Sequence, residues 1–165
     1  MAQLGNTLRV TFTGARIEQA GGILPWQKKV QDQNVWLDYR VTIRVRAGRD
    51  WREEVATEGR ITGEEVRFWA EWFRAAADVR KFPARLGDLP NAPIARLWTP
   101  LAGEAAEFLV WPEATGHLAV MGLFTPEQQQ PHRRFAVETT ADADALRAFA
   151  DALEAEYAAM KAGAR

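Results

Sequence analysis

A strict alternation of apolar and polar residues is the clearest pattern in the chain, and it falls between residues 35 and 46. Its apolar members are Leu37, Tyr39, Val41, Ile43 and Val45. This is the period of a β-strand with one buried face. The turn sequence AGRD separates it from WREEVATEG, so residues 35–58 are predicted to form an antiparallel hairpin. A shorter alternation in TLRVTFTGARI predicts an earlier strand.

Two segments carry the helical period instead. In TGEEVRFWAEWFRAAADV, Thr62 is followed three residues later by Glu65, the arrangement of a capping box, and this predicts a helix at about 62–78. The last segment begins near Thr140 and has apolar residues at helical spacing from Leu146 to Met160. It predicts a second helix at about 141–161.

Four further strands are predicted between the two helices. The stretch KFPARLGDLPNAPIARLWTP contains four prolines and interrupts all periodicity, which is typical of a long connection. From the end of this stretch onward, IARLW, AEFLVWP, HLAVMGLF and RRFAVETT have strand character and are separated by turn sequences. We therefore predict one α+β domain spanning residues 1–165, with a single antiparallel sheet of six or seven strands and both helices packed on one face.

Composition places the chain among globular proteins. Hydrophobic residues make up 47% of 165 positions, with seven Trp and eight Phe, and no apolar run approaches the roughly 20 residues needed to cross a bilayer. MAQLGNTLRV does not resemble a secretion signal, so we expect a cytoplasmic protein. The net charge of −1 gives no global field for nucleic acid, and we expect neither nucleic acid nor membrane as a partner.

Several catalytic chemistries lack their usual residues. The chain contains no Ser and no Cys, the two commonest nucleophiles of acyl transfer. His117 and His132 stand apart from each other and from any metal-binding motif. The acidic pairs Glu64/Glu65 and Asp142/Asp144 fall in first helical turns, where carboxylates complement the helix dipole. No phosphate-binding glycine loop is present. We expect no catalytic residue, no metal site and no cofactor.

The polar face of the sheet is the best candidate for function. If both helices cover one side, alternate residues of the strands point away from the core. Trp and Arg dominate them, and these types are enriched at the energetic centres of protein interfaces. The candidate partner-binding residues are Trp36, Arg40, Arg44, Trp98, Trp111 and Arg134. In the alternative, the arginines pair internally with Glu53, Glu107 or Glu138 and lie on the indoles.

A family resemblance adds a more specific hypothesis. Read in order, NVWLDYRVTIRVRAGRDWREE, ITGEEVRFWAEWFRAA and RRFAVETTADADALRAFADALEAE resemble the WapI-type immunity proteins, small bacterial antidotes of wall-associated and contact-dependent toxins. The resemblance covers most of the chain from about Val35 onward. It implies a protein that neutralises a toxin by direct contact, without catalytic residues. Immunity proteins that block nucleases are often acidic whereas this chain is nearly neutral, so the identity of the toxin stays open.

Two other classes of function remain as alternatives. A ligand-binding or regulatory α+β domain would place its pocket between the sheet and the proline-rich segment. An enzyme would depend on Asp, Glu, Arg or Tyr for its chemistry. The sequence also leaves a homodimer open.

Overall fold

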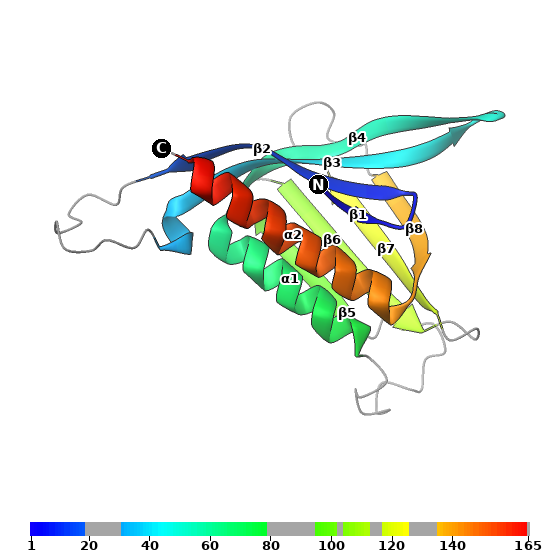
Figure 1. Cartoon of the computed structure of the whole chain (residues 1–165). Helices are drawn as coiled ribbons and strands as arrows, with labels where there is room; N and C mark the ends of the chain where they lie inside the picture. Colours follow the sequence, from blue (N-terminus) through cyan, green and yellow to red (C-terminus); the bar gives the residue numbers. More distant parts are fainter. Residues whose placement is uncertain (19–30, 79–94, 102–103, 113–116, 126–134, 165) are drawn as a thin grey trace, which may run out of the picture.

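The computed structural model describes residues 1–18, 31–78, 95–101, 104–112, 117–125 and 135–164 (Figure 1). Within these residues, the order of four strands followed by a helix occurs twice. The first group is β1 (Ala2–Leu4), β2 (Leu8–Ile17), β3 (Val35–Ala47), β4 (Asp50–Thr62) and α1 (Gly63–Ala77), with a short 3-10 helix, η1 (Asp32–Asn34), before β3. The second group is β5 (Ala95–Leu101), β6 (Glu104–Pro112), β7 (Leu118–Thr125), β8 (Phe135–Ala141) and α2 (Ala143–Gly163).

The described strands form two antiparallel sheets. Sheet A has the order β1-β2-β3-β4, and sheet B has the order β5-β6-β7-β8. The α+β class and the strand segments are as predicted, apart from the three-residue β1, but the prediction of one sheet of six or seven strands is wrong. Turn sequences identify strands that are neighbours along the chain. They carry no information on β4 and β5, which are separated by α1 and do not pair.

Both helices begin and end close to the predicted residues. At the start of α1, the Thr62 hydroxyl accepts the Glu65 N–H at 3.2 Å and the Glu65 carboxylate accepts the Thr62 N–H at 2.7 Å, so the capping box is confirmed. At the start of α2 the cap is Asp142, whose carboxylate accepts the Ala145 N–H at 2.7 Å. The second helix therefore starts slightly later than the predicted position near Thr140.

The helices lie side by side on one side of sheet A (Figure 1). α2 packs against β1 and β2, and α1 packs against β3 and β4. Arg74 of α1 links the pair through ion pairs with Asp151 at 2.7 Å and Glu154 at 2.5 Å of α2. The opposite side of sheet A, which we call its outer face, is not covered by these helices.

One aromatic cluster connects both sheets and both helices. Trp69 of α1 is 1% exposed and lies edge-to-face between Tyr39 of sheet A, at a ring-centroid distance of 6.1 Å, and Phe108 of sheet B, at 5.7 Å. Phe73 continues the contacts to Phe108 at 5.2 Å and to Phe149 of α2 at 4.9 Å. Such pairs add stability beyond the area they bury, so the cluster joins two sheets that share no strand pairing.

Replacing Phe108 with Ala tests this role of the cluster. Phe108 is fully buried, and removing a buried Phe leaves a cavity, so Phe108→Ala is expected to lower the free energy of unfolding by about 3–5 kcal/mol. The matched control is Phe68→Ala, because Phe68 is 53% exposed and its loss should change stability by about 0.5 kcal/mol or less. Urea unfolding measures both values, and equal losses for the two variants would contradict the account.

Candidate protein-recognition surface

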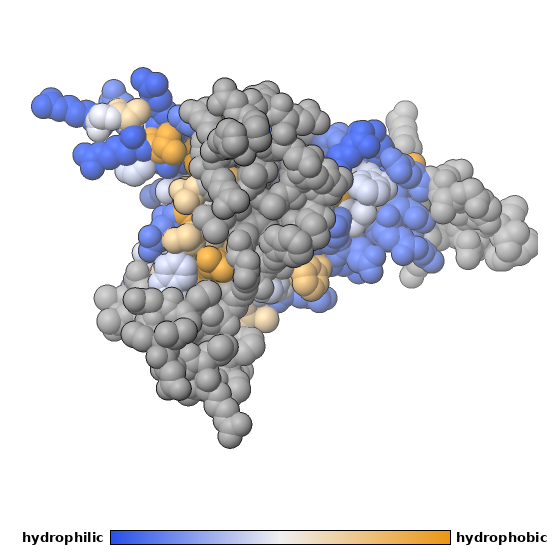
Figure 2. All heavy atoms as spheres, turned by 180° about the vertical axis from the view of Figure 1, so that it is seen from behind, coloured by the Kyte–Doolittle hydropathy of each residue, from blue (hydrophilic) through white to orange (hydrophobic). Residues whose placement is uncertain are grey.

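The outer face of sheet A carries the alternate residues of β3. Because Leu37, Tyr39 and Val41 are buried toward the helices, the intervening positions point to the other side. These positions are Trp36, Asp38, Arg40, Thr42, Arg44 and Arg46. Viewed from behind, the described surface shows hydrophilic residues interspersed with apolar ones (Figure 2). The outer face therefore carries most of the charged groups available for contact on this sheet.

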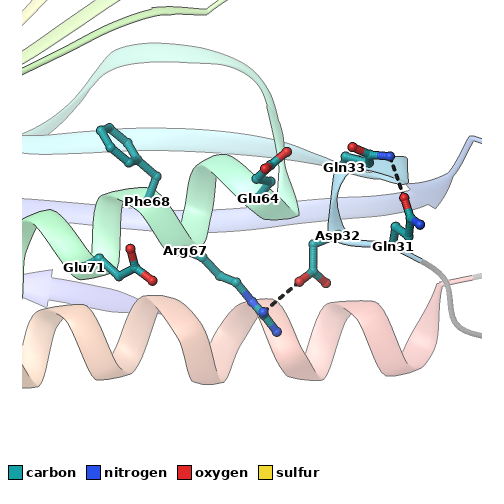
Figure 3. A pocket seen from close by; sticks show the side chains of 7 residues that line it. All are labelled: Gln31, Asp32, Gln33, Glu64, Arg67, Phe68 and Glu71. Carbon is teal, nitrogen blue, oxygen red and sulfur yellow. Dashed lines mark hydrogen bonds and ion pairs between the residues drawn. The ribbon is translucent and has the colours of Figure 1, made fainter.

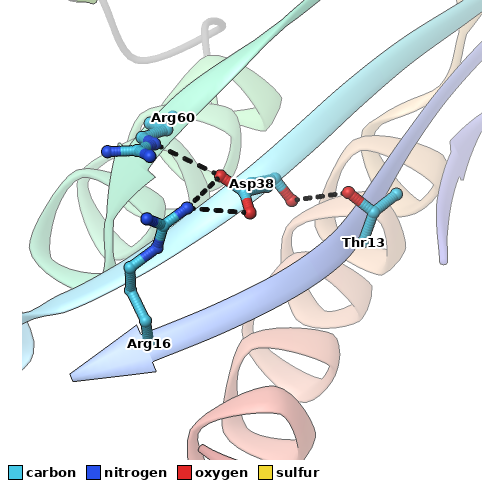
Figure 4. A network of polar contacts seen from close by, with 4 residues as sticks. All are labelled: Thr13, Arg16, Asp38 and Arg60. Atoms are coloured by element: carbon cyan, nitrogen blue, oxygen red, sulfur yellow. Dashed lines mark hydrogen bonds and ion pairs between the residues drawn. The ribbon is translucent and has the colours of Figure 1, made fainter.

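At one end of the outer face, the charges satisfy one another. The Asp38 carboxylate contacts the Arg16 guanidinium at 3.2 Å and the Arg60 guanidinium at 3.4 Å (Figure 4). The backbone carbonyl of Asp38 accepts a hydrogen bond from the Thr13 hydroxyl. Gly14 gives Asp38 room, because a Cβ at this position would lie 3.0 Å from a carboxylate oxygen of Asp38. This end is an internally paired surface.

The middle of the outer face is paired in the same way. Arg40 lies opposite Glu58 in the β3–β4 register and forms an ion pair with it. Arg9 of β2 contacts Glu53 of β4 at 3.2 Å. Arg40, a predicted site residue, thus has a carboxylate partner within the fold, as expected if the arginines pair internally. The partner is Glu58, which was not among the expected carboxylates. Recognition by Arg40 stays a prediction.

Beyond the third strand, the hairpin continues as a two-stranded ribbon. β2 starts at Leu8, opposite Ile43, whereas β3 and β4 extend to a two-residue loop of Gly48 and Arg49. Gly48 has φ 66°, a left-handed conformation that suits the first position of a type II′ turn. Figure 1 shows this end of the hairpin reaching past the other strands. We call residues 44–55 the hairpin tip; they comprise this ribbon and the adjoining Glu54 and Val55, which lie opposite Ile43 and Thr42.

The hairpin tip exposes apolar and cationic groups together. Trp51 is 56% exposed and Val55 is 45% exposed. Their register partners are Arg46 and Thr42, so both side chains lie on the outer face with Arg44. The Arg44 guanidinium lies 5.8 Å from the Trp51 ring centroid, within cation–π range.

The arginines of the hairpin tip differ from those on the rest of the face. The four arginines at positions 44, 46, 49 and 52 form no ion pair with any other described residue. An exposed Trp beside unpaired guanidinium groups has the composition of an interface centre. Trp51 is not among the predicted site residues, although the two-residue turn fixes its register and so places it opposite Arg46.

The remaining predicted site residues are divided between two sheets. Trp36 lies on the outer face of β3 and is partly buried. Trp111 lies in β6, opposite Ala119 of β7, and Trp98 lies in β5, opposite Glu107. Both belong to sheet B, whereas Trp36 belongs to sheet A. The predicted site residues therefore do not lie on one continuous sheet face, contrary to the prediction. The side chain of Trp98 and the whole of Arg134 lie outside the described residues.

A second candidate is a polar groove of about 450 Å³ between η1 and α1 (Figure 3). It is lined by Gln31, Asp32, Gln33, Glu64, Arg67, Phe68 and Glu71. Asp32 contacts Arg67 of α1 at 2.9 Å and Lys161 of α2 at 2.6 Å. It also accepts a hydrogen bond from the Tyr157 hydroxyl. One carboxylate therefore ties η1 to both helices.

The electrostatics of Asp32 fit this structural role. Partial burial alone raises the pKa of Asp32, but hydrogen bonds from Lys161 and Tyr157, together with nearby positive charges, outweigh it and hold the pKa below its usual value. Burial and the hydrogen bond to Asp32 raise the pKa of Tyr157. Gly63 leaves room for the Tyr157 side chain, because a Cβ at position 63 would clash with the Tyr157 hydroxyl oxygen.

The Asp32 contacts predict a pH-dependent contribution to stability. At pH 7, Asp32→Asn is expected to lower the free energy of unfolding by about 1.5–3 kcal/mol, since hydrogen bonds to a charged group are lost. A carboxylate with a lowered pKa stabilises the fold above the unfolded value of 3.8, and this contribution disappears as the pH falls through the folded pKa. Urea unfolding at pH 7 and below pH 3.8 measures the change.

The control is Asp38→Asn. Asp38 also contacts two arginines, but its side chain is 41% exposed against 18% for Asp32. Exposed pairs contribute about 1 kcal/mol or less. A loss for Asp32→Asn that equals the control, or that persists unchanged at low pH, would contradict this role of Asp32.

Other kinds of site find no support in the described part of the chain. It holds no group of three His, Cys, Asp or Glu side chains arranged to bind a metal ion. None of its helices has the length and apolar character required to cross a membrane. Comparison with known proteins found no family model and no curated protein that matches the chain.

Proposed function

We propose that this protein acts by binding another protein and that the hairpin tip is the centre of the interface. The observation that carries the proposal is the exposed Trp51, which shares the outer face with Arg44 and Arg46 at the end of a projecting hairpin. A buried interface gains from both residue types, because an indole offers a large rigid area and a guanidinium offers directional hydrogen bonds.

The contrast within the outer face supports this choice. Arg40 and Arg16 have carboxylate partners, so pairing within the fold accounts for their presence. Trp51 has no comparable role in the fold, since it is 56% exposed and lies outside the hydrophobic core. The exposure of Trp51 together with Val55, beside the Arg44 guanidinium, supports contact with a partner.

For the identity of the partner, we propose a bacterial toxin that is neutralised by direct, non-catalytic contact. The support is the resemblance of the hairpin and helix sequences to WapI-type immunity proteins. The composition of the hairpin tip, with four arginines against three carboxylates, adds that the partner presents an acidic surface. Blocking a toxin by occupying its surface requires no catalytic residue in the antidote.

A second candidate function is the binding of a small molecule in the groove beside α1. Its volume of about 450 Å³ and its exposed Phe68 favour this alternative. Its Asp32, however, already contacts three groups of the fold. The groove therefore offers fewer uncommitted groups than the hairpin tip.

Substitutions at the hairpin tip should separate binding from stability. The partner is first isolated from cells of the source organism with the tagged protein and then purified. Trp51→Ala and Arg44→Ala are each expected to weaken its binding about 30-fold, or about 2 kcal/mol. The melting temperature should stay nearly unchanged, because both side chains are exposed. Calorimetric titration and thermal unfolding supply the two measurements.

Two control variants locate the effect. Arg16→Ala removes an ion-paired arginine of the same face that is not a predicted site residue and should change the affinity by about threefold or less. Phe68→Ala alters the groove and should leave the affinity unchanged. Loss of stability with binding retained in Trp51→Ala would contradict the proposal, and so would loss of binding in Phe68→Ala alone.

A further inference from the structure

β4 is an edge strand of sheet A, and its hairpin tip portion is open to solvent. The strand order leaves one side of β4 without a hydrogen-bonded neighbour in the sheet. From Asp50 to Val55, every residue except the partly buried Glu54 is exposed. A strand edge presents a row of backbone donors and acceptors that can pair with another strand.

The register identifies which backbone groups face outward. In an antiparallel pair, opposite residues alternate between those that exchange hydrogen bonds and those that do not. The Arg44 N–H donates to the Thr7 carbonyl at 2.9 Å, so Arg44 directs its backbone groups toward the β2 side and away from β4. Arg44 and its opposite residue Glu53 are therefore a non-hydrogen-bonded pair, and the N–H and C=O of Glu53 point away from β3.

The same alternation extends along the edge. Trp51 and Val55 lie two residues to either side of Glu53, so their backbone groups also point away from β3. The backbone N–H and C=O groups of Trp51, Glu53 and Val55 thus point away from β3. The side chains of these three residues lie on the outer face, beside Arg44 and Arg46. Backbone and side-chain contacts are available to one ligand at one place.

Most exposed edges carry features that discourage pairing. Here Arg52 and Glu54 supply charges on the opposite face of the ribbon, in register with Val45 and Ile43, and an irregularity near Thr42 supplies a bulge. The outer face differs, because Trp51 and Val55 expose apolar surface on either side of Glu53, whose carboxylate is paired with Arg9. An apolar edge beside cationic groups is suited to a specific strand partner.

We propose that the hairpin tip binds its protein partner by strand addition, with an extended partner segment pairing along residues 51–55 of β4. This inference rests on the proposed function and specifies its binding mode. The segment would carry apolar residues opposite Trp51 and Val55 and acidic residues within reach of Arg44 and Arg46.

A second copy of the chain fits this edge poorly. A two-fold antiparallel pairing that overlaps residues 51–55 completely is centred on Glu53 and sets this carboxylate opposite its own copy, which is destabilising. Nucleic acid is also disfavoured, because Asp50, Glu53 and Glu54 are interleaved with the arginines. The observations therefore favour an acidic segment of a different protein.

The test compares Glu53→Pro with Glu53→Ala. Proline removes the Glu53 N–H, which the alternation directs away from β3, so the hairpin keeps its own hydrogen bonds. Alanine removes the same side chain, including its contact with Arg9, but keeps the N–H. The probe is a fluorescent seven-residue peptide of alternating aspartate and valine, titrated by anisotropy at low salt. Thermal unfolding of both variants verifies their folding.

Strand addition predicts that Glu53→Pro binds the peptide at least tenfold more weakly than Glu53→Ala, with similar melting temperatures. In the wild-type protein, the peptide should slow amide hydrogen exchange at Trp51, Glu53 and Val55 at least tenfold, and this measurement holds even if the proline variant unfolds. Equal binding by two folded variants, protection confined to other residues, or no binding at millimolar peptide would each overturn the inference. Tighter binding of duplex DNA than of the peptide, or dimerisation through this edge, would overturn it as well.

The outcomes also separate this inference from the proposed function. A protein partner that requires Trp51 but binds Glu53→Pro and Glu53→Ala equally would refute strand addition and leave protein recognition in place. Peptide binding with the predicted pattern, but no protein partner in the source cells, would refute the proposed function alone.

Discussion

The edge-to-face packing of Trp69 between Tyr39 and Phe108 is the contact on which the arrangement of the two sheets depends. The sheets share no strand pairing, so side chains must hold them in place. Trp69 is almost completely buried on α1 and reaches both sheets, while Phe73 extends the contacts to Phe149 of α2. Once the inner face of β3 is committed to this cluster, its alternate residues are left on the outer face.

The number of neighbouring strands then decides what the outer-face charges do. Over the body of sheet A, a residue of β3 has neighbours on both β2 and β4, and carboxylates there pair with Arg16, Arg40 and Arg60. Beyond Leu8, β2 is absent and the ribbon has only two strands. Its guanidinium groups have fewer partners, and Trp51 has no third strand to pack on. Where the hairpin leaves the sheet, its four arginines thus form no ion pair with a described residue, whereas Glu53 is paired with Arg9 of β2.

The sequence predicted those features that depend on local periodicity. Thr62 and Glu65 located the start of α1, and the alternation of residues 35–46 located β3 and its buried face. The division into two sheets could not be predicted, because it depends on aromatic contacts between α1 and β6. The Asp32 cluster was also missed, since Asp32 and Tyr157 are 125 residues apart in sequence and meet only after both helices have packed.

For the candidate site, periodicity identified the correct face of β3 but not the part of it that lacks internal partners. That distinction requires the lengths of the neighbouring strands and the positions of the carboxylates. Arg40 and Arg44 are four residues apart and look equivalent in the sequence, yet one is ion-paired and the other lies over Trp51. The projecting end of the hairpin, rather than the middle of the sheet, is therefore the candidate site that we propose.

The most direct test of a binding centre at the hairpin tip is hydrogen–deuterium exchange of the whole chain with and without the isolated partner. The account predicts that added protection concentrates in residues 44–55 and leaves η1 and the exposed side of α1 unchanged. Protection centred on the groove around Asp32 and Phe68, with the hairpin tip exchanging as in the free protein, would contradict it.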